Sequence, residues 1–529
     1  MTTKRANLLI GLANRVSAPQ LALAVLLIVL TWPVYSAIAS NAELSWPSDM
    51  TERTDLIPED RKRVEQVTRP TRDFSTPEGF ENMSGGATTS TKIPNQDAFS
   101  HFAANLTFEE EEFFKLGNAL FRKLWVSSPS STQASDGLGP LFNARSCQSC
   151  HLKDGRGHPP ERSGDATSMF LRLAREAATT ADRAALENFL APNLPDPVYG
   201  GQLQDKAIPG VAAEGTMVIN YSDVPFLFDD DTTVILRKPS YSVTELSQGP
   251  LADDTTLSPR IANPMIGMGL IEAIHPADLI SLADPYDKNG DGISGRLALA
   301  TGTKPEAPII GRFGWKAQNA TVREQSAGAF TGDIGISTPD TPFHNGDCTQ
   351  AQTDCLAATN GVQARLGDTE APDPVLDLVT FYSQNLAVPA RRDVDDPEVL
   401  RGKMHFYQSG CVACHTPKFV TSRRTDNKAH SFQLIWPYAD FLLHDMGEGL
   451  ADGQTVGVAT GREWRTPPLW GIGLTKTVSD HTFFLHDGRA RNLEEAILWH
   501  GGEAEASRNA YATLEKRDRQ ALIRFLNSL

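Results

Sequence analysis

Two copies of the pentapeptide Cys-x-x-Cys-His constrain this chain more than any other feature, one at residues 147–151 and one at residues 411–415. In this motif the two thiols add to the vinyl groups of one porphyrin, and the adjacent imidazole binds its iron, as in c-type haem proteins. A zinc site would need a second ligand pair at zinc-finger spacing, and neither motif has one. The sequence therefore predicts two covalently bound haems. The predicted haem-binding residues are Cys147, Cys150, His151, Cys411, Cys414 and His415, with the two histidines as iron ligands.

The N-terminus is typical of an export signal. Lys4 and Arg5 precede an unbroken apolar run at residues 21–30, and small residues at 37–39 offer a cleavage site. The run has the length of a signal-peptide core and is short for a bilayer span of about 20 residues. We expect a signal peptide at residues 1–39 and a periplasmic protein, because haem attachment of this kind takes place outside the cytoplasm. An uncleaved leader would instead act as a single membrane anchor.

The remaining two cysteines, Cys348 and Cys355, enclose a short polar segment. Such a pair suits a local disulfide in an oxidising compartment. Two free thiols are the alternative, and we expect the disulfide.

Charge narrows the range of partners. The formal net charge of −16 argues against a nucleic acid. An acidic surface would attract a small, basic, soluble electron donor of the cytochrome c or cupredoxin type. A negative net charge is also an ordinary solubility feature, so this partner is a hypothesis.

Local patterns indicate how the chain is organised. Residues 40–79 are polar and aperiodic, which is typical of a linker or disordered arm. Thr107 and Glu110 form a capping-box pattern that predicts a helix start. In that helix Gly117 precedes Phe121 by one turn, and the same Gly-to-Phe step recurs at residues 402–406, before the second motif. This weak repeat favours two similar modules.

The expected fold is mainly α, with two cytochrome c-like haem domains. The first would span residues 80–390, with a small β-rich insertion at about residues 195–345, and the second would span residues 391–529. Short β-branched runs at residues 216–221 and 232–237 predict the strands of the insertion.

A glycine-rich loop suggests calcium. Asp287, Asn289 and Asp291 place oxygen side chains at alternate positions, as at the start of a calcium loop, but the closing acid of that pattern is missing. A plain Asx/Gly turn is the alternative.

Further motifs resemble those of bacterial di-haem cytochrome c peroxidases and of the related enzyme that matures tryptophan tryptophylquinone. These motifs lie at residues 464–470 (WRTPPLW), 484–488 (FLHDG) and 493–496 (LEEA). Residues 136–144 and 443–449 are closer to a branch of di-haem oxidoreductases, also called putative peroxidases or thiol oxidoreductases. The resemblance covers about residues 80–529, and it implies hydrogen peroxide as the substrate.

The resemblance also implies a sixth ligand for the C-terminal haem. In the peroxidases this ligand is a Met one helix beyond the His-Asp-Gly motif. The matching position here is His500, so the chain departs from that pattern, and His415 and His500 become the expected axial pair. Met446 is the alternative ligand. His500 could also be a residue that does not touch the iron.

In the peroxidases the N-terminal haem reduces peroxide with electrons relayed through the C-terminal haem. Asp333 stands where those enzymes carry a distal acid, and it is the candidate general acid/base; a solvated carboxylate is the alternative. Trp315 falls near the position of a Trp between the haems, although it could be plain core. Arg312 could steady charge on haem propionates or peroxide, or pair on the surface.

Three functions fit these features. The first is an exported di-haem c-type oxidoreductase that reduces hydrogen peroxide. The second is a non-catalytic di-haem electron carrier, in which strong ligands fill both axial positions of each iron. The third is a high-valent-haem oxidase of a protein or small molecule.

Overall fold

The structure is a computed structural model that describes residues 46–132, 135–162, 164 and 166–529. The signal peptide predicted at residues 1–39 lies outside these residues. Within them we find no helix that is both long enough and apolar enough for a bilayer span. The predicted boundary between two haem domains, at residues 390 and 391, stays a prediction.

The secondary structure corrects the predicted fold class. Helices make up 30% of the structure and strands 16%, distributed over several small sheets, so the expectation of a mainly α protein with cytochrome c-like domains is wrong. Prolines limit the length of helical segments, as at Pro276, which begins a new short helix soon after the preceding one ends. Strands also lie outside the insertion predicted at about residues 195–345.

The α-helices vary widely in length. Besides four long helices given below, they are α2 (Ser48–Thr51), α3 (Pro58–Thr68), α5 (Cys147–Cys150), α6 (Thr180–Glu187), α7 (Met268–Glu272), α8 (Pro276–Leu282), α9 (Val322–Ala329), α10 (Thr353–Leu356), α13 (Thr475–Ser479), α14 (Leu493–Leu498) and α15 (Glu505–Ala512). The 3₁₀ turns are η1 (Gly86–Thr88), η3 (Leu152–Asp154), η5 (Cys411–Ala413), η6 (Lys428–His430), η7 (Ile472–Leu474) and η8 (Gly502–Ala504), and η4 (Phe330–Ile334) is a π-helix.

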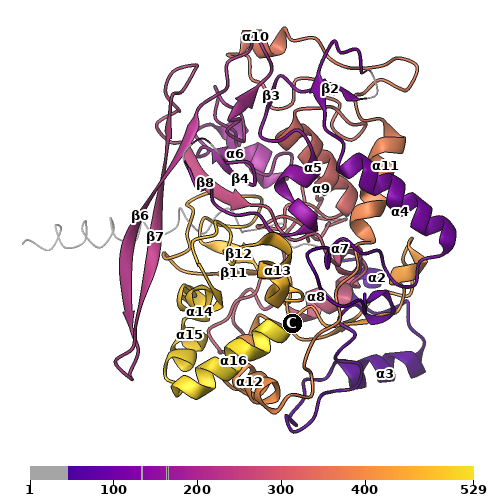
Figure 1. Ribbon diagram of the computed structural model, residues 1–529, viewed down its shortest axis with the longest axis vertical. Helices are drawn as coiled ribbons and strands as arrows, with labels where there is room; N and C mark the ends of the chain where they lie inside the picture. Colours follow the sequence, from indigo (N-terminus) through magenta and orange to yellow (C-terminus); the bar gives the residue numbers. More distant parts are fainter. Residues whose placement is uncertain (1–45, 133–134, 163, 165) are drawn as a thin grey trace, which may run out of the picture. The chain divides into compact units, whose positions relative to one another are not determined.

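Two helix pairs flank the two motifs (Figure 1). α4 (Phe108–Phe121) packs on α11 (Asp373–Gln384), and α12 (Pro397–Gln408) packs on α16 (Lys516–Ser528). The capping box at the start of α4 is present, because Thr107 and the side chain at position N3 exchange both hydrogen bonds. The first helix of each pair carries the Gly-to-Phe step found in the sequence.

In each helix pair, a glycine allows the two helices to pack closely against each other. A Cβ on Gly117 would lie 2.2 Å from the carbonyl oxygen of Leu378 in α11. A Cβ on Gly402 would lie 1.9 Å from the carbonyl oxygen of Ala521 in α16. Both crossings therefore exclude any side chain at these positions.

The Phe that follows each glycine reaches the motif imidazole. The ring centroids of Phe121 and His151 are 6.2 Å apart, and those of Phe406 and His415 are 6.1 Å apart. The internal repeat in the sequence thus corresponds to the same local arrangement at both motifs.

Every sheet that the described residues form is two-stranded. The pairs are β1 with β2, β3 with β5, β4 with β8, β6 with β7, β9 with β10 and β11 with β12. The strands are β1 (Val126–Ser127), β2 (Asp136–Leu138), β3 (Leu141–Phe142), β4 (Met169–Ala174), β5 (Lys206–Ala207), β6 (Thr216–Leu227), β7 (Thr233–Thr244), β8 (Thr256–Ile261), β9 (Phe419–Val420), β10 (Leu434–Ile435), β11 (Leu443–Asp445) and β12 (Glu463–Arg465). β1 and β2 run parallel, and the other pairs are antiparallel.

The long hairpin of β6 and β7 links the middle of the chain to its C-terminal part (Figure 1). The Tyr241 hydroxyl donates to Asp487 over 2.8 Å. The Arg237 guanidinium donates to the carbonyl oxygens of Gly488 and Arg489, over 2.9 and 2.8 Å. These bonds hold the His-Asp-Gly segment, so the hairpin supports a functional motif.

The stretch expected as a linker or disordered arm, residues 40–79, contains α2 and α3 in its described part. Buried ion pairs explain the difference from its polar composition. Arg53 is 8% exposed and bonds Asp55 over 2.9 Å and Asp278 over 2.8 Å. Charged side chains that pair in this way can be buried away from water. The sequence pattern does not reveal such pairing.

Gly402→Ala should destabilise the protein by about 1–3 kcal/mol, because the new methyl group has no room against α16. Gly328→Ala is the matched control. Gly328 also lies in a helix, and no described atom lies within 4 Å of its Cβ position, so alanine should be neutral or slightly stabilising there. Urea denaturation of both variants measures the difference. Equal stabilities would contradict the close crossing of α12 and α16.

Candidate functional site

The first motif lines a cavity that we call the N-cavity. It encloses about 1450 Å³ of empty space, part of which is open to solvent. Cys147 and Cys150 on α5 line it together with His151, and Phe121 of α4 contributes to the wall.

The second motif lines a separate cavity, the C-cavity, with about 1350 Å³ of empty space. Cys411, Cys414 and His415 contribute to its wall. The two alternative candidates for the sixth ligand, His500 and Met446, also line this cavity. The structure thus brings the motif and its candidate axial partners together.

Both motif imidazoles have the same tautomer. Nδ1 of His151 lies 2.8 Å from the carbonyl oxygen of Asn263, and Nδ1 of His415 lies 2.8 Å from that of Tyr438. A carbonyl can only accept, so Nδ1 carries the proton and Nε2 keeps a free lone pair. Burial lowers the pKa of both His151 and His415 to about 4, so both rings are neutral at pH 7. Neutral imidazole is the form that binds iron.

The motif thiols are also neutral. Burial, together with the nearby Asp333 carboxylate, raises the pKa of Cys147 to about 12. Burial likewise raises the pKa of Cys411 to about 12. Metal thiolates and reactive dithiols need lowered thiol pKa values. Among the described residues, no group of three His, Cys, Asp or Glu side chains is gathered to hold a metal ion.

His500 repeats the tautomer of the motif histidines. Its Nδ1 lies 2.7 Å from the carbonyl oxygen of Ala496, so its Nε2 is the free nitrogen. Burial lowers the pKa of His500, which lines the C-cavity together with His415. Met446 is half-buried in the same cavity.

Two other histidines near the C-cavity are engaged elsewhere, whereas His486 lines the cavity and its Nε2 has no hydrogen-bond partner among the described residues. His444 lies between two carboxylates, with Nδ1 2.8 Å from Glu503 and Nε2 2.8 Å from Asp440. Both of its nitrogens are therefore occupied. Nε2 of His481 lies 2.9 Å from the carbonyl oxygen of Arg156, and its Nδ1 accepts from a backbone amide.

Arginines dominate the charged wall of the N-cavity. Five of them line it against a single acid, Asp333: Arg156, Arg172, Arg260, Arg312 and Arg465. Arg156 is 7% exposed, and among the described residues its Nε and Nη1 have no hydrogen-bond partner. Buried guanidinium donors without acceptors suit a ligand with carboxylates, such as the propionates of haem. Arg156 lies in none of the motifs found in the sequence, whereas Arg465 lies in the motif at residues 464–470.

Trp315 lines both cavities. Its indole nitrogen donates to the carbonyl oxygen of Ile261 over 2.9 Å. Its ring lies 6.5 Å from that of Trp464, which stacks on His486 at 3.8 Å. A cluster of aromatic rings therefore stands between the two cavities, and Arg156 also contributes to both walls.

Arg312 is buried and lines the N-cavity, so the alternative of a surface ion pair does not hold. Its Nη1 donates to the carbonyl oxygens of Ile271 and Ile274, over 2.9 and 2.8 Å. Burial lowers the pKa of Arg312 to about 10, which still leaves it charged at pH 7.

Asp333 lies on the π-helix η4 and lines the N-cavity. π-Helical segments occur mostly at functional sites. Burial raises the pKa of Asp333 above its usual range, although the Arg172 charge and a bond from Gln202 act against this. Gln202 Nε2 donates to Asp333 Oδ1 over 2.9 Å. An acid in a buried site next to a cavity can hold or release a proton.

The loop suggested for calcium has its side chains turned to its own backbone. The Asp287 carboxylate accepts from the Gly292 amide, and Asn289 and Asp291 bond each other through their side chains over 3.1 Å. The Asx-turn alternative accounts for these bonds, and calcium stays a prediction. Cys348 and Cys355 form a disulfide.

A comparison with protein families matches residues 80–529 to the family described as "Di-haem oxidoreductase, putative peroxidase". The chain belongs to this family. The match confirms the resemblance inferred from the sequence motifs and indicates two haems and oxidoreductase chemistry. A comparison with curated proteins finds no match. In this di-haem oxidoreductase, each of the two motifs lines one of the two cavities.

Stability should fall in acid because of His486. Burial lowers the pKa of His486 to about 3, so the folded protein leaves it neutral while the unfolded chain protonates it near pH 6.5. The fold therefore loses up to about 1.4 kcal/mol per pH unit below pH 6.5 from this group. His486→Phe keeps a ring on Trp464 and removes the titration. Urea denaturation from pH 8 to pH 4.5 should show a smaller acid loss in the variant.

Above pH 7 the stability difference between the two proteins should stay constant, because His486 is then neutral in both the folded and the unfolded chain. Parallel acid losses in the two proteins would contradict the buried neutral state of His486.

Proposed function

We propose that the chain is an exported c-type di-haem oxidoreductase that reduces hydrogen peroxide at the N-cavity, with electrons relayed through the C-cavity. One observation carries the proposal. Each cavity is lined by one complete Cys-x-x-Cys-His motif, whose imidazole has its Nε2 free because a main-chain carbonyl holds Nδ1. Family membership supports haem and a peroxidase-type reaction.

The residues present fit two haems. Cys147 and Cys150 in the N-cavity, like the thiols of the second motif, are neutral sulfurs suited to thioether bonds, and His151 offers an axial nitrogen. In the C-cavity His415 and His500 both offer Nε2. The unpartnered nitrogens of Arg156 suit a propionate.

A haem held in the N-cavity by Cys147, Cys150 and His151 would supply the electrons for the reduction of peroxide. Asp333 would deliver and accept the protons that this reduction needs, since it is a half-buried acid with a raised pKa on the wall of the N-cavity. Trp315 would keep water out of the space between the two cavities and provide an aromatic link between them.

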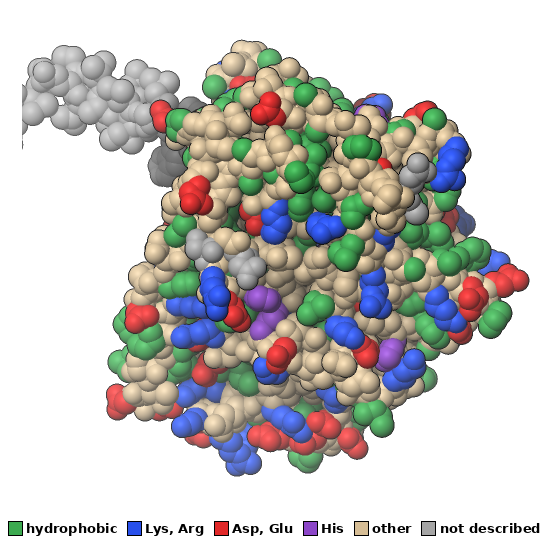
Figure 2. Space-filling model, turned by 45° about the horizontal axis from the view of Figure 1, so that its top comes forward, with side chains coloured by type: hydrophobic (Ala, Val, Ile, Leu, Met, Phe, Trp, Pro, Cys, Tyr) green, Lys and Arg blue, Asp and Glu red, His purple; other side chains and the backbone are tan. Residues whose placement is uncertain are grey.

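The partner and the compartment follow from more general features. The net charge of −16 favours a basic electron donor, but acidic and basic side chains are interspersed on the face in Figure 2, so the net charge alone supports this partner. The disulfide of Cys348 and Cys355 favours an oxidising compartment such as the periplasm.

A second candidate, a non-catalytic electron carrier, has one observation in its favour. Met265 and Met268 line the N-cavity. A Met ligand on the open side of the N-terminal haem would exclude peroxide. Loss of a low-spin signal in Met265→Leu or Met268→Leu, together with inertness of the wild type to peroxide, would support the carrier.

The ligand of the C-terminal haem can be tested by spectroscopy of His500→Ala beside Met446→Ala. We expect only His500→Ala to lose the low-spin signal of that haem, because His500 offers a free Nε2 in the C-cavity. His444→Gln is the control, since both nitrogens of His444 are already bonded to carboxylates. A low-spin signal lost in Met446→Ala and kept in His500→Ala would assign the thioether instead.

Asp333→Asn should slow the reaction with hydrogen peroxide by about 10²–10⁴-fold, the usual effect of losing a general acid. Asp333→Glu should keep part of the rate, because it retains a carboxyl group. Stopped-flow absorbance of the reduced protein mixed with peroxide measures both. The haem content, determined by mass spectrometry, should be two in each variant. A wild-type rate in Asp333→Asn would exclude Asp333 as the proton donor.

A further inference from the structure

The Asp333 side chain is held by a glutamine that the sequence motifs do not include. Gln202 is 0% exposed, and its Nε2 lies within hydrogen-bond distance of three acceptors. These are Asp333 Oδ1 at 2.9 Å, Asn143 Oδ1 at 2.6 Å and the carbonyl oxygen of Gly332 at 3.1 Å. The amide of Gln202 thus fixes both the Asp333 carboxylate and the backbone of the π-helix beside it.

The backbone of Gln202 is fixed in turn by Asp347. The amides of Gly201 and Gln202 donate to Asp347 Oδ2, over 2.5 and 3.1 Å. Gly200 makes this approach possible. Its φ is +73°, and a Cβ there would lie 2.5 Å from Asp347 Oδ2. Asp347 directly precedes Cys348, so the disulfide begins one residue after this contact.

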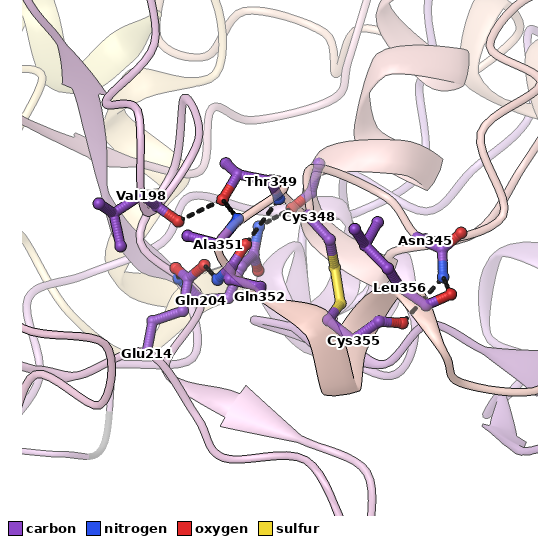
Figure 3. Close-up of a disulfide and its surroundings, with 11 residues drawn as sticks. Val198, Gln204, Glu214, Asn345, Cys348, Thr349, Ala351, Gln352, Cys355 and Leu356 are labelled. Atoms are coloured by element: carbon purple, nitrogen blue, oxygen red, sulfur yellow. Dashed lines mark hydrogen bonds between the residues drawn. A yellow bond between two sulfur atoms is a disulfide. The ribbon is translucent and has the colours of Figure 1, made fainter.

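The loop closed by the disulfide, residues 347–356, holds the same segment at two more points (Figure 3). The Thr349 hydroxyl donates to the carbonyl oxygen of Val198 over 2.7 Å. Gln352 Nε2 donates to Glu214 over 2.5 Å, and Glu214 accepts the Gln204 amide over 2.6 Å. We call residues 347–356 the disulfide loop.

A second glutamine on this segment also reaches the π-helix. Gln204 Nε2 donates to the carbonyl oxygen of Gly332 over 2.7 Å, so that carbonyl accepts from both Gln202 and Gln204. The segment at residues 198–214 therefore stands between the disulfide loop on one side and η4 with Asp333 on the other.

We propose that Gln202 is a positioning residue for Asp333, and that the disulfide of Cys348 and Cys355 sets its position through Asp347. The proposal rests on the proposed function of Asp333 as the proton donor. A carboxyl group that must meet a small substrate within hydrogen-bond distance tolerates little displacement, and a 1 Å error can cost about 100-fold in rate. Opening the disulfide loop then frees residues 198–214 and lets Asp333 leave its place.

A purely structural role would have a different signature. The bonds around Asp347 could stabilise the fold without any effect on the reaction. In that case, removing them would lower the free energy of unfolding and leave the peroxide rate and its pH profile unchanged. The position of Asp333 is therefore tested by kinetics and by local exchange, and not by stability alone.

The first test uses Gln202→Leu, which removes the donor to Asp333. Gln433→Leu is the matched control, because the Gln433 amide also bonds main-chain groups, at Ala87 and Ser431, but lines neither cavity among the described residues. We expect Gln202→Leu to lower the rate with hydrogen peroxide at least 10-fold and to shift its pH profile. Gln433→Leu should keep the wild-type rate and profile.

The decisive comparison repeats Gln202→Leu in an Asp333→Asn background. If Gln202 acts through Asp333, Gln202→Leu should lower the peroxide rate of the Asp333→Asn protein only slightly. Additive losses would overturn the positioning role. A wild-type rate in Asp333→Asn would instead overturn the proposed function, so the two failures can be told apart.

The double variant Cys348→Ser/Cys355→Ser tests the role of the disulfide. Asp347→Asn tests the link through Asp347 while the disulfide is kept. Hydrogen–deuterium exchange, followed by mass spectrometry without peroxide, should show faster exchange at residues 330–335 in both variants. Their peroxide rates should fall with that of Gln202→Leu. Unchanged exchange and unchanged rates in Asp347→Asn would overturn the link even if the double variant fails to fold.

Discussion

A main-chain carbonyl holds each motif imidazole, and both cavities depend on this interaction. The carbonyls belong to Asn263 and Tyr438, which lie outside the pentapeptides. Each carbonyl accepts a hydrogen bond from the Nδ1 proton. The segments that carry these carbonyls therefore leave the Nε2 lone pair free to bind a metal. The pentapeptide supplies the ligand, but the surrounding fold fixes its tautomer and its direction.

The parts of the fold that depend on local sequence could be predicted. The capping box at Thr107 marks the start of α4, and the Gly-to-Phe step marks both helix crossings. The fold class could not, because most strands are only two or three residues long and some pair with strands far away in the sequence. β4 pairs with β8, more than 80 residues later, and such pairings leave little periodicity in the sequence. The buried ion pairs of Arg53 were missed for the same reason: composition does not reveal which charges meet.

The candidate site divides in the same way. The haem motifs, Asp333 and Trp315 were found from spacing and resemblance, and the structure brings them to the walls of the cavities. No sequence pattern singled out Arg156 or Gln202, because their importance comes from the residues that surround them in the folded protein. Arg156 stands out by donors that no described residue satisfies, and Gln202 by three acceptors around one amide. Such features exist only once the chain is folded.

The two helix crossings determine which contacts can form late in folding. α4 must wait for α11, which begins about 250 residues later, and α12 must wait for α16 at the extreme C-terminus. Non-local contacts of this kind form late, because a long loop has to close first. Both thiol pairs therefore stay accessible in the unfolded chain until these distant helices pack. Burial of the thiols in the walls of the two cavities is then a late event, which follows the closure of both loops.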